Sequence, residues 1–566
     1  MENIEARILI SNLLARVVTD VTGSMSLPGV LTASELQALH CAVTLLGGGA
    51  LATTLPPGIA VTDIPPKAEL PTQSSTAPTQ LPAGPDPNTS ALSLPPVQDM
   101  RLCLDFGTAM SKATLVLDEE PEKIVVLELG KPGDQEQISP VMLISSVYID
   151  NSGLIWFGKS AVDRSLVEGE DGSRQRLDNI KRRLSEDGFD DVVRTPTYAP
   201  PGVEVTYGQM ILAYLMFLTW ATNRSLEAKG YPRNVRRRFA MPCFPSDKSR
   251  DVSHVLRKML GEAQVLADTF SDDMTTGLPV REFVDVAKRV KAAKHDYPFM
   301  AEDITEPLGV AGALLSWRAR VDMLVMVIDV GAGTSDLSLY RILVDPERRQ
   351  NAAEEVKGSA RGITEAGNYL DRILIEFILR KAGITSNDPE AVIARSKLEL
   401  NIRDYKETLF NEQFVFVALT STRDVEVELA EFLDLEAVKG FGKSLRDTMQ
   451  DILESVDHSV VDWVLASPSR YLTVALTGGG ATLPMVMELA RTPLTIRGRI
   501  VPVQPALPFP TWLQTEYTEL EDDFARIAVS LGGARQRLVR RGTGASVLGG
   551  DLAHPPKLGG YYQRGD

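Results

Sequence analysis

Asp105-Phe-Gly-Thr108 and Asp329-Val-Gly-Ala-Gly-Thr-Ser-Asp336 share one pattern, in which an aspartate ends an apolar strand and a glycine turn follows. A second strand-like segment comes after each turn, at residues 113–117 and 337–342. Glycine reaches positive φ without steric cost, so each turn can aim backbone N–H groups at an anion. An aspartate at the strand end can hold Mg²⁺ through its water ligands. The pair therefore predicts two β-hairpins that hold one nucleotide from opposite sides.

The composition is typical of a globular protein with more than one domain. The chain has 566 residues, of which 44% are hydrophobic and 24% charged, and its net charge is -16. A single core rarely grows beyond ~250–300 residues, so roughly two to four domains are expected. The acidic balance argues against nucleic-acid or anionic-membrane binding. Two basic clusters, residues 233–238 and 535–541, are expected to be solvated surface segments.

The cysteines and the amino-terminal region predict a cytoplasmic protein. Cys41, Cys103 and Cys243 lie far apart in apolar surroundings, which favours buried thiols in a reducing compartment over disulfides or a zinc site. Glu2 stands where a secretory signal needs basic residues. Residues 36–62 carry no formal charge, but glycines and prolines interrupt them, so no membrane span is expected.

Residues 1–50 predict a small helical unit. Apolar residues recur at helical spacing from Ile4 to Val21, and Thr32-Ala-Ser-Glu35 has the form of a capping box. Residues 51–98 form a predicted linker rich in Pro, Ser and Thr. Two short helices bury little surface alone, so we expect them to dock on the body of the chain, on a second copy or on a partner.

A third glycine turn lies at Gly478-Gly-Gly480, before Pro484, which suits a first helical turn. No GxxxxGK[ST] motif occurs, so a Walker-type NTPase is not supported. In this order and spacing, the three turns resemble the nucleotide-binding fold shared by actin, Hsp70 chaperones and sugar kinases. The resemblance covers about residues 100–540. It implies an α/β, two-lobed actin-like ATPase (ribonuclease H-like) fold with a short helical N-terminal extension.

Four further segments are similar to the Hsp70 branch of this fold: residues 239–250, 306–313 and 366–371, and Lys406-Glu-Thr-Leu409. The resemblance implies a first lobe at 99–322, a second lobe at 323–541 and a flexible tail at 542–566. It implies ATP or ADP with Mg²⁺ as the ligands. Because only about 30 residues follow the last matching helix, it also implies that a conventional peptide-binding domain is missing.

The resemblance gives each motif residue a role. Asp105 and Asp329 would hold the hydrated Mg²⁺. Glu306 would position or activate the attacking water, and Asp329 and Thr334 would be catalytic residues with it. Lys181 looks like the Hsp70 lysine that reaches the phosphates, whereas Lys112 is placed as in actins, and either or both can serve. The phosphates would contact Gly107, Thr108, Gly331, Gly333 and Thr334, and the opposing turn and adenosine motif would supply Gly367, Asn368, Lys406, Gly478, Gly479 and Gly480.

Three residues depart from the Hsp70 pattern. Ala109 replaces a threonine, Arg403 replaces a glutamate near the sugar or base, and Asn368 replaces a glycine that asparagine can mimic in left-handed geometry. The resemblance then implies an ATP-dependent switch that signals to a protein partner, with the partner bound by the N-terminal helices. The alternatives are a filament-forming actin homologue and a nucleotide-binding scaffold with little hydrolysis. The partner's identity and the oligomeric state stay open.

Overall fold

The computed structural model describes residues 18–19, 25–26, 84–169, 171–184, 188–244, 246–385, 387–420 and 423–542. The chain divides into two compact units, Met1–Thr79 and Gln80–Asp566. In the first unit, the described residues form one antiparallel pair, β1 (Val18–Thr19) and β2 (Met25–Ser26). The predicted helix is wrong at Val18 and Thr19, whose β-branched side chains favour strand. The rest of the predicted helical unit and the tail after residue 542 lie outside the described residues.

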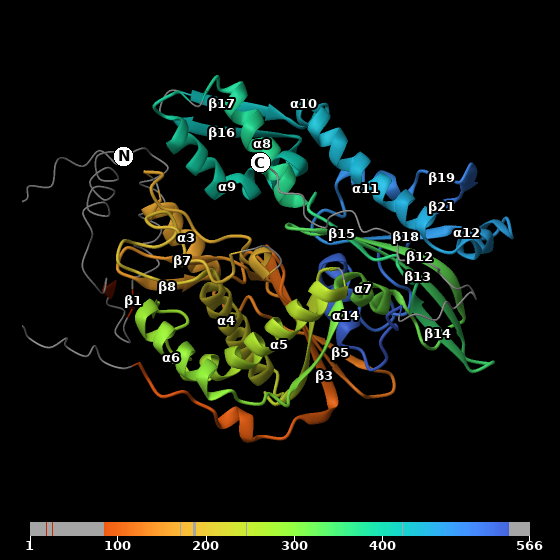
Figure 1. The fold of residues 1–566 in the computed structure, drawn as a ribbon, viewed down its shortest axis with the longest axis horizontal. Coiled ribbons are helices and arrows are strands. Elements are labelled where there is room, and N and C mark those ends of the chain that lie inside the picture. Colours follow the sequence, from red (N-terminus) through yellow and green to blue (C-terminus); the bar gives the residue numbers. More distant parts are fainter. Residues whose placement is uncertain are drawn as a thin grey trace, which may run out of the picture. The chain divides into compact units, whose positions relative to one another are not determined.

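A first mixed sheet contains the first hairpin (Figure 1). Its strand order is β11-β9-β3-β4-β5, and β6 also pairs with β4. β3 pairs antiparallel with β4 and parallel with β9. At the two ends of the sheet, β5 pairs antiparallel with β4, and β11 pairs parallel with β9. The strands are β3 (Val97–Asp105), β4 (Met110–Leu117), β5 (Lys123–Val126), β6 (Leu143–Ile144), β9 (Val235–Met241) and β11 (Met300–Thr305).

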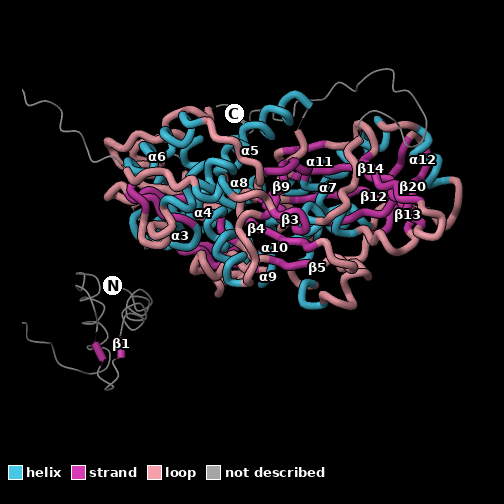
Figure 2. The backbone as a smooth tube through the Cα atoms, turned by 90° about the horizontal axis from the view of Figure 1, so that it is seen from below, coloured by secondary structure: helices cyan, strands magenta, loops and turns pink. Residues whose placement is uncertain are grey.

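A second mixed sheet contains the second hairpin and repeats this plan. Its order is β14-β13-β12-β18-β21. Read from β21 to β14, its pairings are parallel, parallel, antiparallel and antiparallel, as they are in the first sheet from β11 to β5. Figure 2 shows the strands of both sheets in magenta. The strands are β12 (Val321–Val330), β13 (Ser335–Asp345), β14 (Gln350–Glu355), β15 (Arg361–Ile363, paired with β13), β18 (Leu472–Thr477) and β21 (Val503–Pro505). Both predicted hairpins are therefore confirmed.

Smaller strand pairs flank the two sheets. β7 (Val147–Ile149), β8 (Leu154–Phe157) and β10 (Leu278–Pro279) form one antiparallel sheet. Two antiparallel pairs are β16 (Phe414–Thr420) with β17 (Arg423–Glu428), and β19 (Leu494–Ile496) with β20 (Arg499–Val501).

Helices fill the connections between strands. Those before the second sheet are α3 (Gly158–Glu168), α4 (Tyr207–Ala228), α5 (Ser246–Thr269), α6 (Val280–Ala293) and α7 (Glu306–Leu314), with short 3₁₀ turns at Ser90–Ser93 and Ile180–Leu184. The helices that follow the first strand of the second sheet are α8 (Gly367–Lys381), α9 (Ala391–Glu412), α10 (Leu429–Leu433), α11 (Glu436–Ser455), α12 (His458–Leu465), α13 (Pro484–Met487) and α14 (Phe524–Ala534), with 3₁₀ turns at Glu488–Ala490 and Thr518–Leu520.

One apolar cluster joins the two sheets through α7 and α14. It combines Cys103 and Ala240 of the first sheet with Val325 and Ile342 of the second. The two helices touch through their backbones, because a Cβ atom on Gly532 would lie 1.8 Å from the carbonyl oxygen of Gly309. Interior packing at this density resists deformation, so the cluster fixes how the two hairpins face each other.

The predicted linker at 51–98 ends earlier than expected. The Arg289 side chain of α6 donates hydrogen bonds to the carbonyl oxygens of Gly84 and Pro85. The backbone N–H of Asn88 donates to Thr269 Oγ1, and β3 begins at Val97. Residues 84–98 therefore belong to the second unit and pack on its helices, and the remaining linker residues lie outside the described residues.

Candidate functional site

The first hairpin turns where β3 ends. Asp105, its last residue, is buried and lies opposite Lys112 across the strand pair. Lys112 Nζ lies 3.3 Å from Asp105 Oδ2. A Cβ atom on Gly107 would lie 1.9 Å from the carbonyl oxygen of Met110, so only glycine fits this turn. The hairpin thus sets a carboxylate and an ammonium group at the end of the strand.

The second hairpin places two aspartates opposite each other. Asp329 in β12 is in register with Asp336 in β13, and both are buried. Asp336 accepts hydrogen bonds from Thr334 Oγ1 at 2.8 Å and from the backbone N–H of Cys243 at 2.6 Å. The sequence assigns no role to Asp336. Its position two residues after Thr334 and opposite Asp329 in the predicted hairpin could have marked it as a site residue. The contact with Cys243, by contrast, has no local sequence signal.

The tips of the two hairpins meet. A Cβ atom on Gly333 would lie 2.8 Å from Thr108 Oγ1, so the second turn approaches the first more closely than a side chain allows. Thr108, Thr334 and Lys181 line one cavity together with Pro242 of the loop after β9. Two turns separated by more than 200 residues in sequence thereby lie side by side at one cavity.

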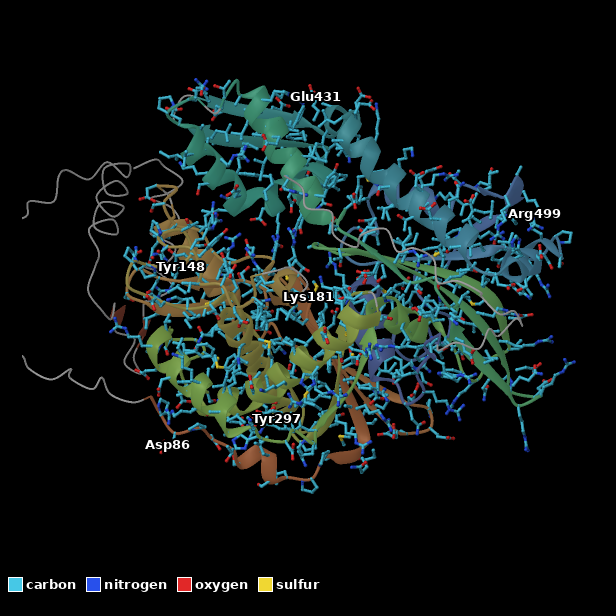
Figure 3. All side chains as sticks on the ribbon, in the orientation of Figure 1. Asp86, Tyr148, Lys181, Tyr297, Glu431 and Arg499 are labelled. Carbon is cyan, nitrogen blue, oxygen red and sulfur yellow. The ribbon has the colours of Figure 1, made fainter. Side chains whose placement is uncertain are left out.

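A buried ion pair lies beside the two turns. Lys181 Nζ is 2.5 Å from Glu306 Oε1, and both side chains are largely excluded from solvent. Lys181 is labelled in Figure 3. Burial alone would lower the pKa of Lys181, but the carboxylates of Glu306 and Asp105 raise it above its usual range. Glu306 is the first residue of α7, where the helix dipole favours a negative charge.

The carboxylates near the turns repel one another. Burial raises the pKa of Asp329 well above its usual range, and the charges of Glu306, Asp336 and Asp105 raise it further. Burial and the nearby Glu306 raise the pKa of Asp336 to about 7. Clustered acidic groups with raised pKa values are a physical sign of a functional site.

The third turn packs directly behind the second hairpin. Gly478 has a φ of +81°, and a Cβ atom there would lie 2.4 Å from Asp329 Oδ1. The backbone N–H of Gly480 donates to the carbonyl oxygen of Val330 at 2.9 Å. A Cβ atom on Gly479 would meet no heavy atom of the described residues within 4 Å. The helix predicted at Pro484 is confirmed as α13.

The opposing turn also reaches the second hairpin. The backbone N–H groups of Gly367 and Asn368 donate to the carbonyl oxygens of Gly331 and Ala332, at 3.0 and 2.7 Å. Lys406 Nζ donates to the carbonyl oxygen of Gly367 at 3.1 Å. Asn368 Nδ2 is buried and has no hydrogen-bond partner among the described residues. Every residue predicted for the site is therefore brought to the three turns or to the segments that contact them.

Arg403 makes a contact that the sequence did not predict. Its Nη2 donates to Asn179 Oδ1 at 2.7 Å, two residues before Lys181. Arg176 donates to the carbonyl oxygen of Leu400 at 2.7 Å. Helix α9 therefore contacts the segment before Lys181 at two residues, Arg176 and Asn179. Burial would raise the pKa of Asp178, but Arg176, Arg403 and a hydrogen bond from Ser146 lower it. Arg403, which replaces the Hsp70 glutamate near the sugar or base, thus contacts the segment that carries Lys181.

The described residues lack two features. They contain no group of three or more His, Cys, Asp and Glu side chains arranged to hold a metal ion. None of their helices is long and apolar enough to cross a membrane.

Comparison with known proteins points to one kind of chaperone. No protein-family model matches the chain. The chaperone protein DnaK3 of Thermosynechococcus vestitus is 25% identical over 199 residues, which are 33% of this chain and 27% of DnaK3. DnaK1 of Prochlorococcus marinus is 22% identical over 268 residues, 45% of this chain and 36% of DnaK1. DnaK of Mycoplasmoides gallisepticum is 27% identical over 205 residues, 33% of this chain and 31% of that protein. The chain thus spans about a third of these relatives and is distantly similar to DnaK/Hsp70 chaperones.

Proposed function

We propose that the chain is an Hsp70-like switch that binds and hydrolyses ATP in a cleft between two lobes. The observation that carries this proposal is the meeting of Thr108 and Gly333, one from each hairpin, beside the Lys181–Glu306 pair. The shared topology of the two sheets supports a two-lobed, ribonuclease H-like arrangement, with lobes at 99–322 and 323–541. The distant similarity to DnaK chaperones supports the nucleotide.

The residues present fit Mg²⁺ and a phosphate chain. Asp105, Asp329, Asp336 and Glu306 gather buried negative charge that a divalent cation would offset. Asp105 and Asp329 would hold the ion, and Mg²⁺ commonly binds one or two carboxylates together with substrate phosphates and water. When bound, the ion neutralises charge on the phosphate oxygens. Asn368 Nδ2 is a buried donor with no partner among the described residues, so it remains able to bind a ligand oxygen.

The chain's own groups would divide the remaining work. Backbone N–H groups of the two turns and the hydroxyl groups of Thr108 and Thr334 would bind phosphate oxygens. Lys181 would place its ammonium against the transferring phosphoryl group, and Glu306 would orient a water molecule through its carboxylate. The hydrogen bond between Lys181 and Glu306 holds the two side chains together.

The second part of the proposal concerns the partner. The DnaK relatives are named chaperone proteins, so we infer that this chain also has a protein partner. The segment before residue 80 would bind this partner, and the predicted linker would connect that segment to the rest of the chain. Cys103 and Cys243 are free and buried, which accords with a cytoplasmic location.

Deleting residues 1–79 is expected to leave the affinity for ATP·Mg²⁺ within about threefold of the full chain. The reason is that all residues of the candidate site lie in the unit Gln80–Asp566. Isothermal titration calorimetry of both proteins measures this. The same deletion should abolish capture of the partner. Loss of ATP binding on deletion would contradict the assignment of nucleotide binding to the second unit and partner binding to the first.

One observation favours the scaffold alternative. One carboxylate oxygen of Glu306, Oε1, accepts a hydrogen bond from Lys181, so water has fewer acceptor sites left on this carboxylate. The single-turnover rates of ATP hydrolysis by wild type and by Glu306→Gln distinguish an ATPase from a nucleotide-binding scaffold.

A further inference from the structure

The strand pair β16–β17 has one buried face and one exposed face (Figure 1). The buried face consists of four valines that belong to the same apolar cluster as residues of α9, namely Val415, Val417, Val425 and Val427. On the other face, Phe414 is 44% exposed and Phe416 is 63% exposed, and their ring centroids lie 5.6 Å apart. The open face of an antiparallel sheet is usually polar, so two adjacent aromatic rings on it indicate a binding surface.

A row of carboxylates lies beside the two rings. Across the strand pair, Glu428 is in register with Phe414, and Glu426 is in register with Phe416. Asp424 continues the row, and all three acidic side chains are exposed. None of the three forms an ion pair with another described residue. Like charges without a counter-charge favour a cationic ligand, and the faces of aromatic rings also attract cations.

The outer edge of β16 has no strand beside it. Among the described residues, β16 pairs with β17 alone. The backbone N–H of Leu429 donates to the carbonyl oxygen of Gln413, so Gln413 is a hydrogen-bonded position of this ladder. Such positions alternate along an antiparallel pair, so the N–H and C=O groups of Phe414 and Phe416 point away from β17. β16 also contains no charged residue and no proline, the groups that usually protect an edge strand from pairing.

We propose that an extended, basic segment of a partner protein adds to β16 as a third strand. Main-chain hydrogen bonds to the open edge supply affinity, and every second side chain of the segment supplies specificity. Lysine or arginine at these positions contacts the two rings, and its long side chain reaches toward the carboxylates of β17, one strand further.

A second copy of the chain fits this face less well, because two acidic rows would then meet. The binding is separate from the proposed nucleotide site. It needs neither ATP nor the segment before residue 80.

Fluorescence anisotropy of labelled peptides, titrated with the full chain in the absence of nucleotide, tests the proposal. The probes are a heptapeptide in which lysine and valine alternate, the same peptide with glutamate in place of lysine, and the lysine peptide with every backbone nitrogen methylated. The lysine peptide is expected to bind with a Kd of roughly 10–100 μM at about 0.1 M salt. The glutamate peptide should bind at least about tenfold more weakly because its charge is repelled. The methylated peptide should also lose at least about tenfold, because it cannot donate hydrogen bonds to the edge of β16.

Two variants of the exposed face have matched controls elsewhere in the chain. Phe416→Ser is expected to weaken binding of the lysine peptide at least about fivefold, because an exposed ring is lost. Glu426→Gln should weaken it about two- to threefold, since a surface ion pair contributes little. Ile500→Ser in β20 and Glu521→Gln, at the end of a 3₁₀ turn, make the same kinds of change at exposed positions and should leave the Kd unchanged.

The proposal is overturned if the glutamate peptide or the methylated peptide binds as tightly as the lysine peptide. It is also overturned if Phe416→Ser and Glu426→Gln both match wild type. Sedimentation velocity of the chain alone tests the other occupant of the face. A dimer that Phe416→Ser abolishes would assign the face to a second copy and overturn the proposal, whereas an oligomeric state that this variant leaves unchanged supports it.

Discussion

Replacing Glu306 with glutamine is expected to slow single-turnover ATP hydrolysis at least about 100-fold, because the carboxylate that orients water is lost. The ATP affinity should stay within about threefold. Glutamine is the suitable change, since its amide oxygen can still accept from Lys181, whereas alanine would leave a buried ammonium unpaired. Rapid mixing of excess protein with ATP and quenching at intervals measures the rate.

Glu302→Gln provides the matched control for this experiment. Glu302 lies in β11, the strand that leads into Glu306, and it pairs with Arg238 away from the turns. This variant should hydrolyse ATP at the wild-type rate. Equal rates for wild type and Glu306→Gln would mean that Glu306 does not serve catalysis, and would favour the scaffold alternative.

Gly333→Val is expected to raise the Kd for ATP·Mg²⁺ at least about 100-fold. Even a Cβ atom at this position would lie 2.8 Å from Thr108 Oγ1, and the valine methyl groups would fill the space where the two hairpins meet. The loss of two or more hydrogen bonds to a charged phosphate accounts for the expected size of the effect. Equilibrium titration with a fluorescent ATP analogue measures it.

The comparison for this variant is Gly440→Val in α11. A Cβ atom on Gly440 would meet no heavy atom of the described residues within 4 Å, so the change tests the cost of valine alone. Thermal unfolding of both variants checks that each is folded. If Gly333→Val binds ATP as tightly as Gly440→Val, the nucleotide does not lie between the hairpins.

The sequence predicted those parts of the site that depend on local sequence patterns. The two hairpins and the α13 start at Pro484 follow from apolar runs that end in glycine or proline, and the structure confirms them. A Gly-rich turn after a strand has few conformations open to it, so its residues are good predictors of its geometry.

The remaining features depend on contacts between distant segments. Nothing near Arg403 in sequence shows that it bonds Asn179, and nothing near Cys243 shows that its N–H reaches Asp336. The matching strand order of the two sheets is also a property of pairing, to which local propensity contributes little. At Val18, apolar spacing favoured helix while β-branching favoured strand, and the pairing with β2 prevailed.

The central claim is that the three turns hold ATP together with Mg²⁺. Calorimetric titration of ATP into the full chain, with Mg²⁺ and again with excess EDTA, tests it most directly. We expect one site per chain with a Kd in the range of roughly 0.1–10 μM in Mg²⁺, and at least about tenfold weaker binding in EDTA. No binding up to about 1 mM ATP, or an affinity that does not depend on Mg²⁺, would contradict the account.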